Sequence, residues 1–502
     1  MQHPTLAHAF FAIARAHPDR PALCFTDDGS AVAYGELAGV AAGFAERFRQ
    51  AALQPGDVIA LPCDRSLEFF GAFWGAWLAR LSVALLNPTP APGDLLGALE
   101  RTQPRVLAGR EATLDRLRGM TPDAQTPTFL ALDAQSDPAA PADDATNDPA
   151  DDAVIVLTSG TTGRPKGVRH SHHSLLSCVQ ATRDAFPFAD GAVILSLLPH
   201  DHLHGLLMTV VLPVLLGGSV VVAPTFGPFV APRVWDFIRE FKVNHFSAVP
   251  GVLGVLADFH ARLENPHHEM LRFGFCASAP LSAELRQIWF DRIGCPIANN
   301  YGLSEAASWV AFGSLDRHAP QTTVGKPSRC VIEIFDDQGN ALPPGRSGEV
   351  TIKGEQLMRG YLHDPERTAQ VLRDGRLFTG DLGHLDEEGR LYLEGRKVET
   401  INTGGLKVNP VEIEEPLRDL DGVGDIVAFG WPDSHLGEIP AVAVVADGRA
   451  PTLAAIRRHL QGLLTAYKMP RKCFVVDQIP RNALGKVQRL ALQQRLMKMS
   501  DC

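Results

Sequence analysis

The sequence predicts an α/β fold: a large N-terminal domain of parallel-sheet lobes plus a β-rich lobe, followed by a small α+β C-terminal domain. Three observations predict this fold. Short apolar runs rich in β-branched residues alternate with helix-like stretches up to about residue 300, which is typical of buried parallel strands. From about Cys330 the runs are separated by closely spaced turn signals, which favours a β-rich lobe. After Arg396 predicted helices and strands alternate in a shorter segment.

We expect a domain boundary that leaves residues 1–395 as the N-terminal domain and residues 396–502 as the C-terminal domain. At roughly 100–200 residues per domain, the length suggests about three domains or lobes, so the larger domain should be divided. In the smaller domain, Asn409–Leu420 and Thr452–Tyr467 are predicted helices. Examples of the predicted strands of the parallel sheets are Val58–Pro62, Val83–Leu86, Val154–Leu157, Ala192–Leu198, Val220–Ala223, His245–Val249 and Phe273–Ala277.

The composition is that of a water-soluble globular protein. Hydrophobic residues make up 45% and charged residues 21% of the chain, and the formal net charge is −10. No run of Lys and Arg is long enough to form the basic face that non-specific nucleic-acid binding requires, so we expect no nucleic-acid partner. The eight cysteines form no CxxC pair. They are therefore expected to be scattered reduced thiols of a cytoplasmic protein rather than metal ligands.

Neither of the two apolar segments that could involve a membrane predicts a span. The N-terminal segment lacks the basic region of a signal peptide, and charge interrupts its apolar stretch early. The segment Gly205–Pro224 is almost long enough to cross a bilayer. Pro213 and the pair Gly217-Gly218 divide it, which favours a buried helix, a turn and a short inner strand Ser219–Ala223.

The strongest local signal is the segment LTSGTTGRPKG, which runs from Leu157 to Gly167 between an apolar strand and a helix that begins near Ser171. Glycines and small hydroxyl residues let backbone N–H groups close around a phosphate, and Lys166 adds positive charge. The segment is not a Walker A loop, because Pro165 and Gly167 stand where that motif needs Gly and Ser or Thr. An ordinary turn would not need so many hydroxyl residues. The predicted phosphate-binding residues are Thr158, Ser159, Gly160, Thr161, Thr162, Gly163 and Lys166.

This segment resembles the phosphate loop of the AMP-forming adenylate ligases, the superfamily of acyl-CoA synthetases, peptide-synthetase adenylation domains and luciferases. The resemblance covers essentially the whole chain and is strongest to free-standing acyl-CoA synthetases, including the malonyl-CoA synthetase type. Its further motifs, in chain order, are Leu198–Gly205, Ala277–Leu281, Asn300–Glu305, Met358–Tyr361, Thr379–Leu382, Gly395-Arg396 with Gly404-Gly405, and Pro480–Lys486.

The resemblance implies an enzyme that uses ATP and Mg²⁺ to activate a small carboxylic acid as acyl-AMP, with release of pyrophosphate, and then forms a thioester. Coenzyme A is the preferred acceptor, and the phosphopantetheine thiol of a separate carrier protein is the alternative. The acid stays open among aryl, short aliphatic and hydroxy acids, and the chain is expected to be a monomer or homodimer. A scaffold protein that has lost the chemistry is a further alternative. Only Val398, which replaces the usual Asp or Lys of the domain hinge, favours it.

The resemblance also implies roles for residues at the nucleotide phosphates. Tyr301 would stack on adenine, and Gly302 would permit close approach of the backbone. Ser304 would donate a hydrogen bond to a phosphate oxygen. Glu305 and Thr158 would supply hard oxygen ligands for Mg²⁺.

Three further roles concern the ribose, the domain junction and the chemical step. Asp381 resembles the ribose-binding aspartate, because a carboxylate can accept from both ribose hydroxyls. Arg396 resembles the arginine that meets the nucleotide near the domain junction. Lys486 resembles the lysine that bridges the attacking carboxylate and the α-phosphate, where a point charge offsets the approach of two anions.

The acyl pocket is implied by two motifs. His202 resembles the histidine beside the pocket. The resemblance places Ala277, Ser278, Ala279 and Asn300 among the nucleotide-binding residues, and Ala277 replaces a glycine common in relatives, so its methyl would shift the adenine or acyl pocket slightly. Asn300 occupies the position where an enzyme specific for a dicarboxylate would need a cationic side chain to pair with the second carboxylate. An asparagine there argues against malonate and favours a monocarboxylate with some polarity.

Overall fold

The computed structural model describes the chain with gaps, and every structural statement below refers to the described residues. They form two compact units, Met1–Val331 with Ile352–Leu377 and Ile332–Thr351 with Phe378–Cys502. The boundary expected between residues 395 and 396 stays a prediction. The described residues are 5–121, 127–134, 148–158, 166–188, 190–262, 269–396, 401–403, 406–433, 437–461, 463–464, 466–482, 485 and 487–500.

The first unit contains two seven-stranded sheets, which confirms the predicted parallel-sheet lobes. In the first sheet the order is β13-β12-β11-β9-β10-β1-β2, and every described neighbour pair is parallel except β1 with β2. Parallel strands must be covered on both faces, so their side chains read as continuous apolar runs. These strands are β1 (Pro21–Phe25), β2 (Ala31–Ala33), β9 (Val193–Ser196), β10 (Ser219–Val222), β11 (His245–Ala248), β12 (Phe273–Cys276) and β13 (Ile297–Asn299).

The second sheet has the order β18-β8-β7-β4-β3-β5-β6. Its strands β7, β4, β3, β5 and β6 run parallel, whereas β8 is antiparallel to both β7 and β18. The antiparallel end of this sheet carries part of the candidate active site. Its strands are β3 (Val58–Pro62), β4 (Ser82–Leu86), β5 (Val106–Gly109), β6 (Thr128–Ala131), β7 (Asp152–Thr158), β8 (Lys166–Ser171) and β18 (Gly360–Tyr361).

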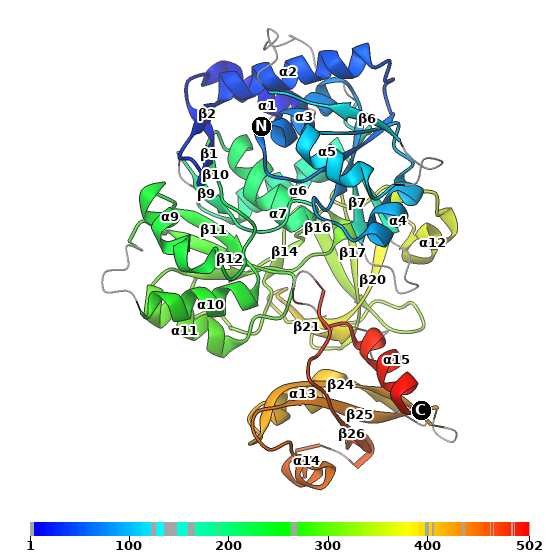
Figure 1. Cartoon of the computed structure of the whole chain (residues 1–502). Coiled ribbons are helices and arrows are strands. Elements are labelled where there is room, and N and C mark those ends of the chain that lie inside the picture. Colours follow the sequence, from blue (N-terminus) through cyan, green and yellow to red (C-terminus); the bar gives the residue numbers. More distant parts are fainter. Residues whose placement is uncertain are drawn as a thin grey trace. The chain divides into compact units, whose positions relative to one another are not determined.

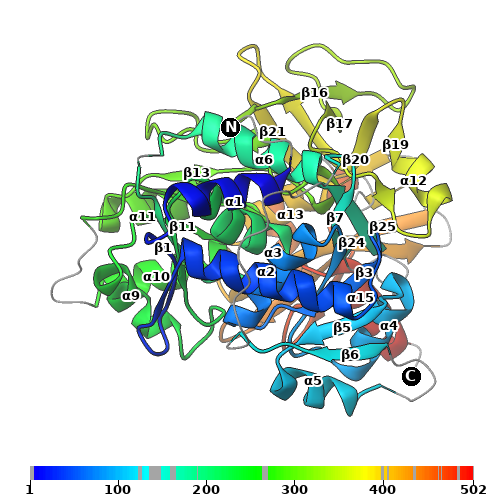
Figure 2. The ribbon, with the colours of Figure 1, turned by 90° about the horizontal axis from the view of Figure 1, so that it is seen from above.

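Helices of the first unit bury apolar faces against these sheets. Figure 1 shows α9, α10 and α11 beside β11 and β12, where Trp235, Leu253 and Trp289 share one apolar cluster. Figure 2 shows α1, α2 and α3 together, and they pack against one another. The helices are α1 (Leu6–Ala16), α2 (Tyr34–Gln50), α3 (Leu67–Leu78), α4 (Pro92–Thr102), α5 (Glu111–Arg118), α6 (His172–Ala185), α9 (Val234–Glu240), α10 (Pro250–His260), α11 (Ala283–Ile293) and α12 (Pro365–Val371).

Helix α3 shows why the centre of this unit is so apolar. The Ser66 hydroxyl caps it by accepting from the N–H of Phe69. Trp74 and Trp77 are fully buried, and the indole N–H of Trp77 donates to the carbonyl of Ala153 at 2.9 Å. Burial of a helix on all sides requires apolar residues on every face, which is what this segment offers.

The segment Gly205–Pro224 folds as predicted, into buried helix, turn and strand. It begins within α7 (Leu203–Leu206), continues through a π-helical stretch Leu207–Val211 and α8 (Leu212–Leu215), and ends in β10. The side chains from Leu206 to Leu215 are buried in the core. Across the described residues, no helix combines the length and the apolar character that a membrane crossing needs.

A third sheet confirms the predicted β-rich lobe. Its order is β16-β17-β20-β19, with β21 paired to β20. A two-stranded pair, β14 (Ala311–Phe312) with β15 (Lys326–Pro327), precedes it in the chain. The strands of the third sheet are β16 (Cys330–Phe335), β17 (Gly348–Gly354), β19 (Leu372–Arg373), β20 (Arg376–Leu385) and β21 (Leu391–Arg396).

The C-terminal segment forms a mixed sheet with helices, as predicted. The sheet order is β23-β22-β25-β24, with β26 parallel to β25. The helix predicted over Thr452–Tyr467 is shorter, because Gln461 after α14 is already extended, with φ −65° and ψ 127°. The elements are β22 (Ile401–Thr403), β23 (Leu406–Val408), α13 (Pro410–Leu417), β24 (Val423–Asp433), β25 (Gly437–Ala446), α14 (Leu453–Leu460), β26 (Lys472–Val475) and α15 (Arg489–Ser500).

A buried ion pair ties α15 to the rest of this sheet. Arg489 donates to both carboxylate oxygens of Glu414, at 2.7 and 2.9 Å, and the N–H of Ala428 donates to the same carboxylate at 2.8 Å. The two charged side chains are 15% and 6% exposed. Removing one partner of such a pair leaves an uncompensated buried charge.

We therefore expect Arg489→Met to weaken this unit by about 3–5 kcal/mol. Hydrogen exchange at the Ala428 amide measures this change locally. A loss of about 3 kcal/mol should make the exchange more than about a hundredfold faster. Arg49→Met is the control, since its pair with Glu46 is 48% and 52% exposed and should cost less than about 1 kcal/mol. Equal effects of the two variants would contradict the assignment.

Candidate active site

The predicted phosphate loop joins two antiparallel strands. Thr158 ends β7, Lys166 begins β8, and these two residues are paired in the sheet. The loop residues Ser159–Gly163 predicted to bind phosphate lie outside the described residues. Strand β8 stands between the loop and the predicted helix, which begins after Ser171 as α6, with the Ser171 hydroxyl as its cap. The short polar run KGVRHS gave little strand signal, so this strand was missed from the sequence.

The candidate magnesium ligand Glu305 lies in a short 3₁₀ turn, Ser304–Ala306, and its side chain is half-buried. The hydroxyl of Tyr361 donates to Glu305 Oε1 at 2.8 Å, and the N–H of Met358 donates to the Glu305 carbonyl at 2.9 Å. The ammonium of Lys166 lies 5.1 Å from the centre of the Tyr361 ring. The structure therefore brings two predicted site residues, Glu305 and Lys166, to one tyrosine.

A buried histidine fixes the same turn from the other side. Nε2 of His170, on β8, donates to the carbonyl of Ser304 at 2.6 Å, because a carbonyl can only accept. Complete burial lowers the pKa of His170 to about 4, so the ring is neutral at pH 7. Its Nδ1 lies 3.1 Å from the Ser174 hydroxyl. The cluster of His170, His172 and His173 was expected at a helix N-terminus beside the phosphates, but His170 lies on β8, and no sequence pattern indicated its contact with Ser304.

Tyr301 and Gly302 lie where the chain folds back on itself. Tyr301 is 7% exposed and pairs with Ala311 through backbone hydrogen bonds. A Cβ at Gly302 would lie 1.4 Å from the carbonyl oxygen of Ser308. Any side chain there would push these backbones apart, so the fold itself requires glycine at this position.

A second buried imidazole links the two motifs implied for the acyl pocket. His204 Nδ1 lies 2.9 Å from the Ser278 hydroxyl, and its Nε2 lies 2.7 Å from the Ser247 hydroxyl. Burial, aided by the nearby His202, lowers the pKa of His204 to about 3. A neutral ring donates from one nitrogen and accepts at the other, so His204 holds the two serines in complementary roles. Ala277 is buried beside them, whereas Ser278 is exposed.

The other histidines of this motif face different surroundings. His200 Nε2 lies 2.7 Å from the Ser196 hydroxyl, and its ring stacks on Phe69 at 5.9 Å. His202 is half-buried and precedes the first residue of α7. The two buried rings, His200 and His204, therefore serve separate networks. Within the described ranges, no three metal-ligating side chains come together.

Asn300 is 3% exposed, and one of the two polar atoms of its side-chain amide has a hydrogen-bond partner among the described residues. Its Oδ1 accepts from the N–H of Gly313 at 3.0 Å, while its Nδ2 has no partner among the described residues. The indole N–H of the buried Trp309 likewise lacks a described partner. Buried donors of this kind are costly unless a ligand or water accepts from them.

Two predicted nucleotide contacts are paired to each other within the second unit. Asp381 on β20 and Arg396 on β21 occupy paired positions in the sheet, and Arg396 Nε donates to Asp381 Oδ1 at 2.6 Å. Asp381 is 7% exposed. The arginine thus holds the carboxylate that was predicted to bind ribose. Lys486 lies outside the described residues.

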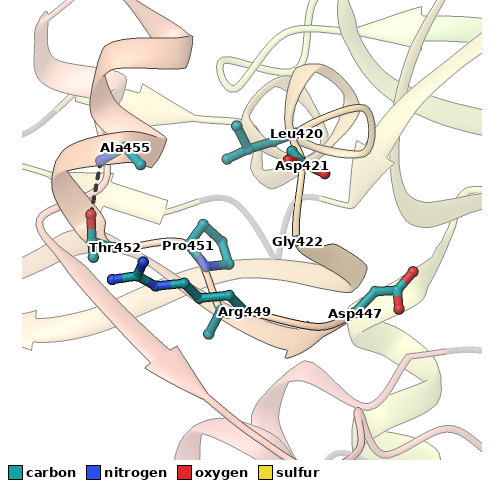
Figure 3. A pocket seen from close by; sticks show the side chains of 9 residues that line it. Leu420, Asp421, Gly422, Asp447, Arg449, Pro451, Thr452 and Ala455 are labelled. Atoms are coloured by element: carbon teal, nitrogen blue, oxygen red, sulfur yellow. Dashed lines mark hydrogen bonds between the residues drawn. The ribbon is translucent and has the colours of Figure 1, made fainter.

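A shallow pocket of about 400 Å³ lies elsewhere in the second unit (Figure 3). Its walls come from the turn between α13 and β24 and from the segment between β25 and α14, and they include Asp421, Asp447 and Arg449. No predicted site residue lines it. The candidate active site is therefore defined by the motif residues and not by this hollow.

Comparisons with known proteins identify the family of the chain. A model of the AMP-binding enzyme family matches residues 10–362, and a model of the AMP-binding enzyme C-terminal domain matches residues 412–486. The oxalate–CoA ligase of Arabidopsis thaliana is 29% identical and aligns over 99% of this chain and 100% of its own length. The sulfoacetate–CoA ligase of Cupriavidus necator is 31% identical over 97% of each protein. ATP-bound MatB from Rhodopseudomonas palustris superposes with a TM-score of 0.88 at 27% identity, covering 99% of this chain and 100% of that one.

The chain belongs to the AMP-binding enzyme family, which confirms the predicted resemblance and fold class. Within that family it is an AMP-forming acid–thiol ligase of the acyl-CoA synthetase class. It activates a carboxylic acid with ATP and Mg²⁺ to acyl-AMP and forms the thioester with coenzyme A.

The depressed pKa of His170 predicts a pH-dependent stability. A histidine that binds its proton more weakly when folded stabilises the fold above the unfolded pKa of about 6.5, and this contribution is lost as pH falls through about 4. His170→Gln keeps an N–H that can donate to Ser304 and removes the titration. The free energy of unfolding falls when the pH is lowered from 7 to 4.5. We expect this fall to be smaller in the His170→Gln variant than in the wild type, by roughly 2–3 kcal/mol.

Urea unfolding at both pH values measures this difference, and His173→Gln is the control because His173 is 51% exposed. A His170→Gln variant with the same acid sensitivity as the wild type would overturn the interpretation.

Proposed function

We propose that Lys166, Glu305 and Thr158 form the part of the site that receives the ATP phosphates and Mg²⁺. One observation carries this proposal: Glu305 and Lys166 both contact Tyr361, one at its hydroxyl and one at its ring. Thr158 is paired with Lys166 in the sheet. A half-buried carboxylate and a threonine hydroxyl are hard oxygen donors and fit Mg²⁺. When bound, the metal supplies positive charge that offsets charge on the phosphates.

The other phosphate contacts of this proposal come from Ser304 and the loop. Ser304 is half-buried in the same turn as Glu305, so its hydroxyl can donate beside the carboxylate. The loop residues Ser159, Gly160, Thr161, Thr162 and Gly163 are proposed to wrap the phosphates with backbone N–H groups, a role supported by the strand ends that bracket them. Tyr301 and Gly302 would lie against the adenine.

Asp381 and Arg396 are proposed to bind the ribose and the nucleotide at the junction of the two predicted domains, 1–395 and 396–502. Their ion pair supports this role, because Arg396 orients a carboxylate whose oxygens are suited to accept from ribose hydroxyls. Lys486 is proposed to lie between the acid and the α-phosphate during adenylation. A cation there lowers the repulsion between two anions and gains strength as charge develops in the transition state.

The acid is proposed to be small and to carry a second oxygen-bearing group. The unpartnered Nδ2 of Asn300 supports this, since a buried donor needs an acceptor, and an amide suits an uncharged oxygen better than a second carboxylate. His202, Ala277, Ser278 and Ala279 are proposed as neighbours of the same pocket. The names of two relatives, an oxalate–CoA ligase and a sulfoacetate–CoA ligase, support a short acid, but the second group of both named acids is charged, unlike the uncharged oxygen that Asn300 favours.

The enzyme is further proposed to work in the cytoplasm as a monomer or homodimer. The seven described cysteines are all free thiols, which supports a reducing compartment. A carrier-protein phosphopantetheine presents the same thiol, so the decisive experiment includes both acceptors.

The test is release of pyrophosphate with Mg-ATP over a panel of short keto, hydroxy, aryl and aliphatic acids, with coenzyme A or with a carrier protein. We expect one class of acid to give a coenzyme A thioester, and Lys486→Ala to lower its rate by roughly a hundredfold or more. Lys472→Ala is the control, since this lysine lies over Trp431 at 4.6 Å and outside the motifs.

Thioester formed only on the carrier protein would replace coenzyme A as the acceptor. Binding of ATP without release of pyrophosphate from any acid would favour the scaffold alternative and contradict the proposal.

Asn300→Asp tests whether the Asn300 side chain recognises the second oxygen-bearing group of the acid. The variant keeps the oxygen that accepts from Gly313 and replaces the free N–H donor by a second oxygen. We expect kcat/KM for a short keto acid to fall by about tenfold or more relative to the plain acid of equal length. The ratio between the two acids, measured in wild type and variant, cancels any general loss of stability. An unchanged ratio of the two kcat/KM values would show that Asn300 does not contribute to selection of the acid.

A further inference from the structure

We propose that Tyr361 is a positioning residue that holds Glu305 and Lys166 together, so that the metal and the phosphates are bound as one unit. This inference rests on the proposed roles of Glu305 and Lys166. Tyr361 is 5% exposed and contacts both side chains, one with its hydroxyl and one with its ring.

The hydroxyl of Tyr361 orients the carboxylate. It donates to Glu305 Oε1 at 2.8 Å, and a hydrogen bond to an ionised carboxylate is among the stronger ones in proteins. A glutamate otherwise samples many rotamers, and a metal ligand must be held close to its binding geometry. With one oxygen held by Tyr361, the orientation of the whole carboxylate is set before any metal arrives.

The ring of Tyr361 places the lysine. The Lys166 ammonium lies 5.1 Å from the ring centre, within the range of a cation–π contact. The guanidinium of Arg367 lies 6.0 Å from the same centre. Two cations beside one ring keep positive charge next to the carboxylate, which is the charge distribution that a bound metal–phosphate group needs.

The backbone of Tyr361 is tied to the strand that carries Lys166. Tyr361 pairs with Val168, and the N–H of Leu362 donates to the carbonyl of Gly167 at 2.7 Å. Tyr361 also donates its N–H to the Thr368 hydroxyl at 2.9 Å. Gly360 has φ +137°, a conformation that side chains rarely adopt, and this sets the direction in which Tyr361 leaves the turn. The tyrosine is thus fixed relative to Lys166 before it contacts Glu305.

A purely structural tyrosine in this protein has different contacts. The hydroxyl of Tyr34 lies 2.9 and 2.7 Å from the backbone carbonyls of Val214 and Gly218, both buried. Tyr361 instead donates to a half-buried carboxylate within a predicted site. Tyr34→Phe is therefore a matched control that removes a buried hydroxyl at a distance from the predicted site residues.

The experiment compares ATP binding with Mg²⁺ and with EDTA by calorimetry, which separates the metal contribution from the rest. Glu305→Gln should abolish most of the gain in affinity that Mg²⁺ gives the wild type. We expect Tyr361→Phe to reduce that gain by roughly tenfold and to leave binding in EDTA nearly unchanged, because the ring is kept. Tyr361→Leu should also weaken binding in EDTA by about twofold to tenfold, because the ring contact to Lys166 is lost.

Coupling between the residues distinguishes positioning from stability. In the Glu305→Gln background, Tyr361→Phe should have little further effect on the Mg²⁺ gain, and Tyr34→Phe should not change it in any background. If Tyr361→Phe alters only the melting temperature, as Tyr34→Phe does, the positioning role is wrong although the proposed site stands. If Glu305→Gln keeps the full Mg²⁺ gain, the proposed metal site is wrong and this inference with it.

Discussion

The antiparallel placement of β8 between β7 and β18 is the constraint on which the described active site depends. Lys166 begins this strand, His170 lies near its end, and its neighbour β18 carries Tyr361. Ladder hydrogen bonds set these side chains at fixed spacings. Because His170 and Tyr361 both reach the turn that holds Glu305, one strand determines the position of the candidate metal ligand and the candidate phosphate lysine together.

Burial keeps the polar groups around the site uncharged or paired. His170 and His204 are neutral because desolvation disfavours the imidazolium, so each can accept as well as donate within its network. Within the second unit, taken by itself, the predicted ribose ligand Asp381 is buried and paired with Arg396. A site that must accept several negative charges gains from neutral donors and fixed cations already in place, since little rearrangement is then needed when the nucleotide binds.

Much of the fold was predictable because parallel strands buried on both faces produce continuous apolar runs. All seven predicted strands match observed strands within a few residues, from β3 at Val58 to β12 at Phe273. Strand β8 was missed since Val168 is its one large apolar residue and the strand follows a glycine-rich loop. Helix α14 was predicted too long because its apolar residues continue past Leu460, whereas the backbone turns there. The ends of an element are the part that local patterns predict least well.

The sequence by itself determined the family, the class of reaction and the residues that carry the motifs, because phosphate loops, hard metal ligands and catalytic lysines need particular side chains at particular positions. It could not determine which of these residues touch. The contacts of Tyr361 with Glu305 and Lys166, and of His170 with Ser304, join segments far apart in the chain, separated by 56 and 134 positions in the two hydrogen bonds. Only the tertiary structure decides such contacts, since they follow from the pairing of strands in the sheet and not from any local preference of the chain.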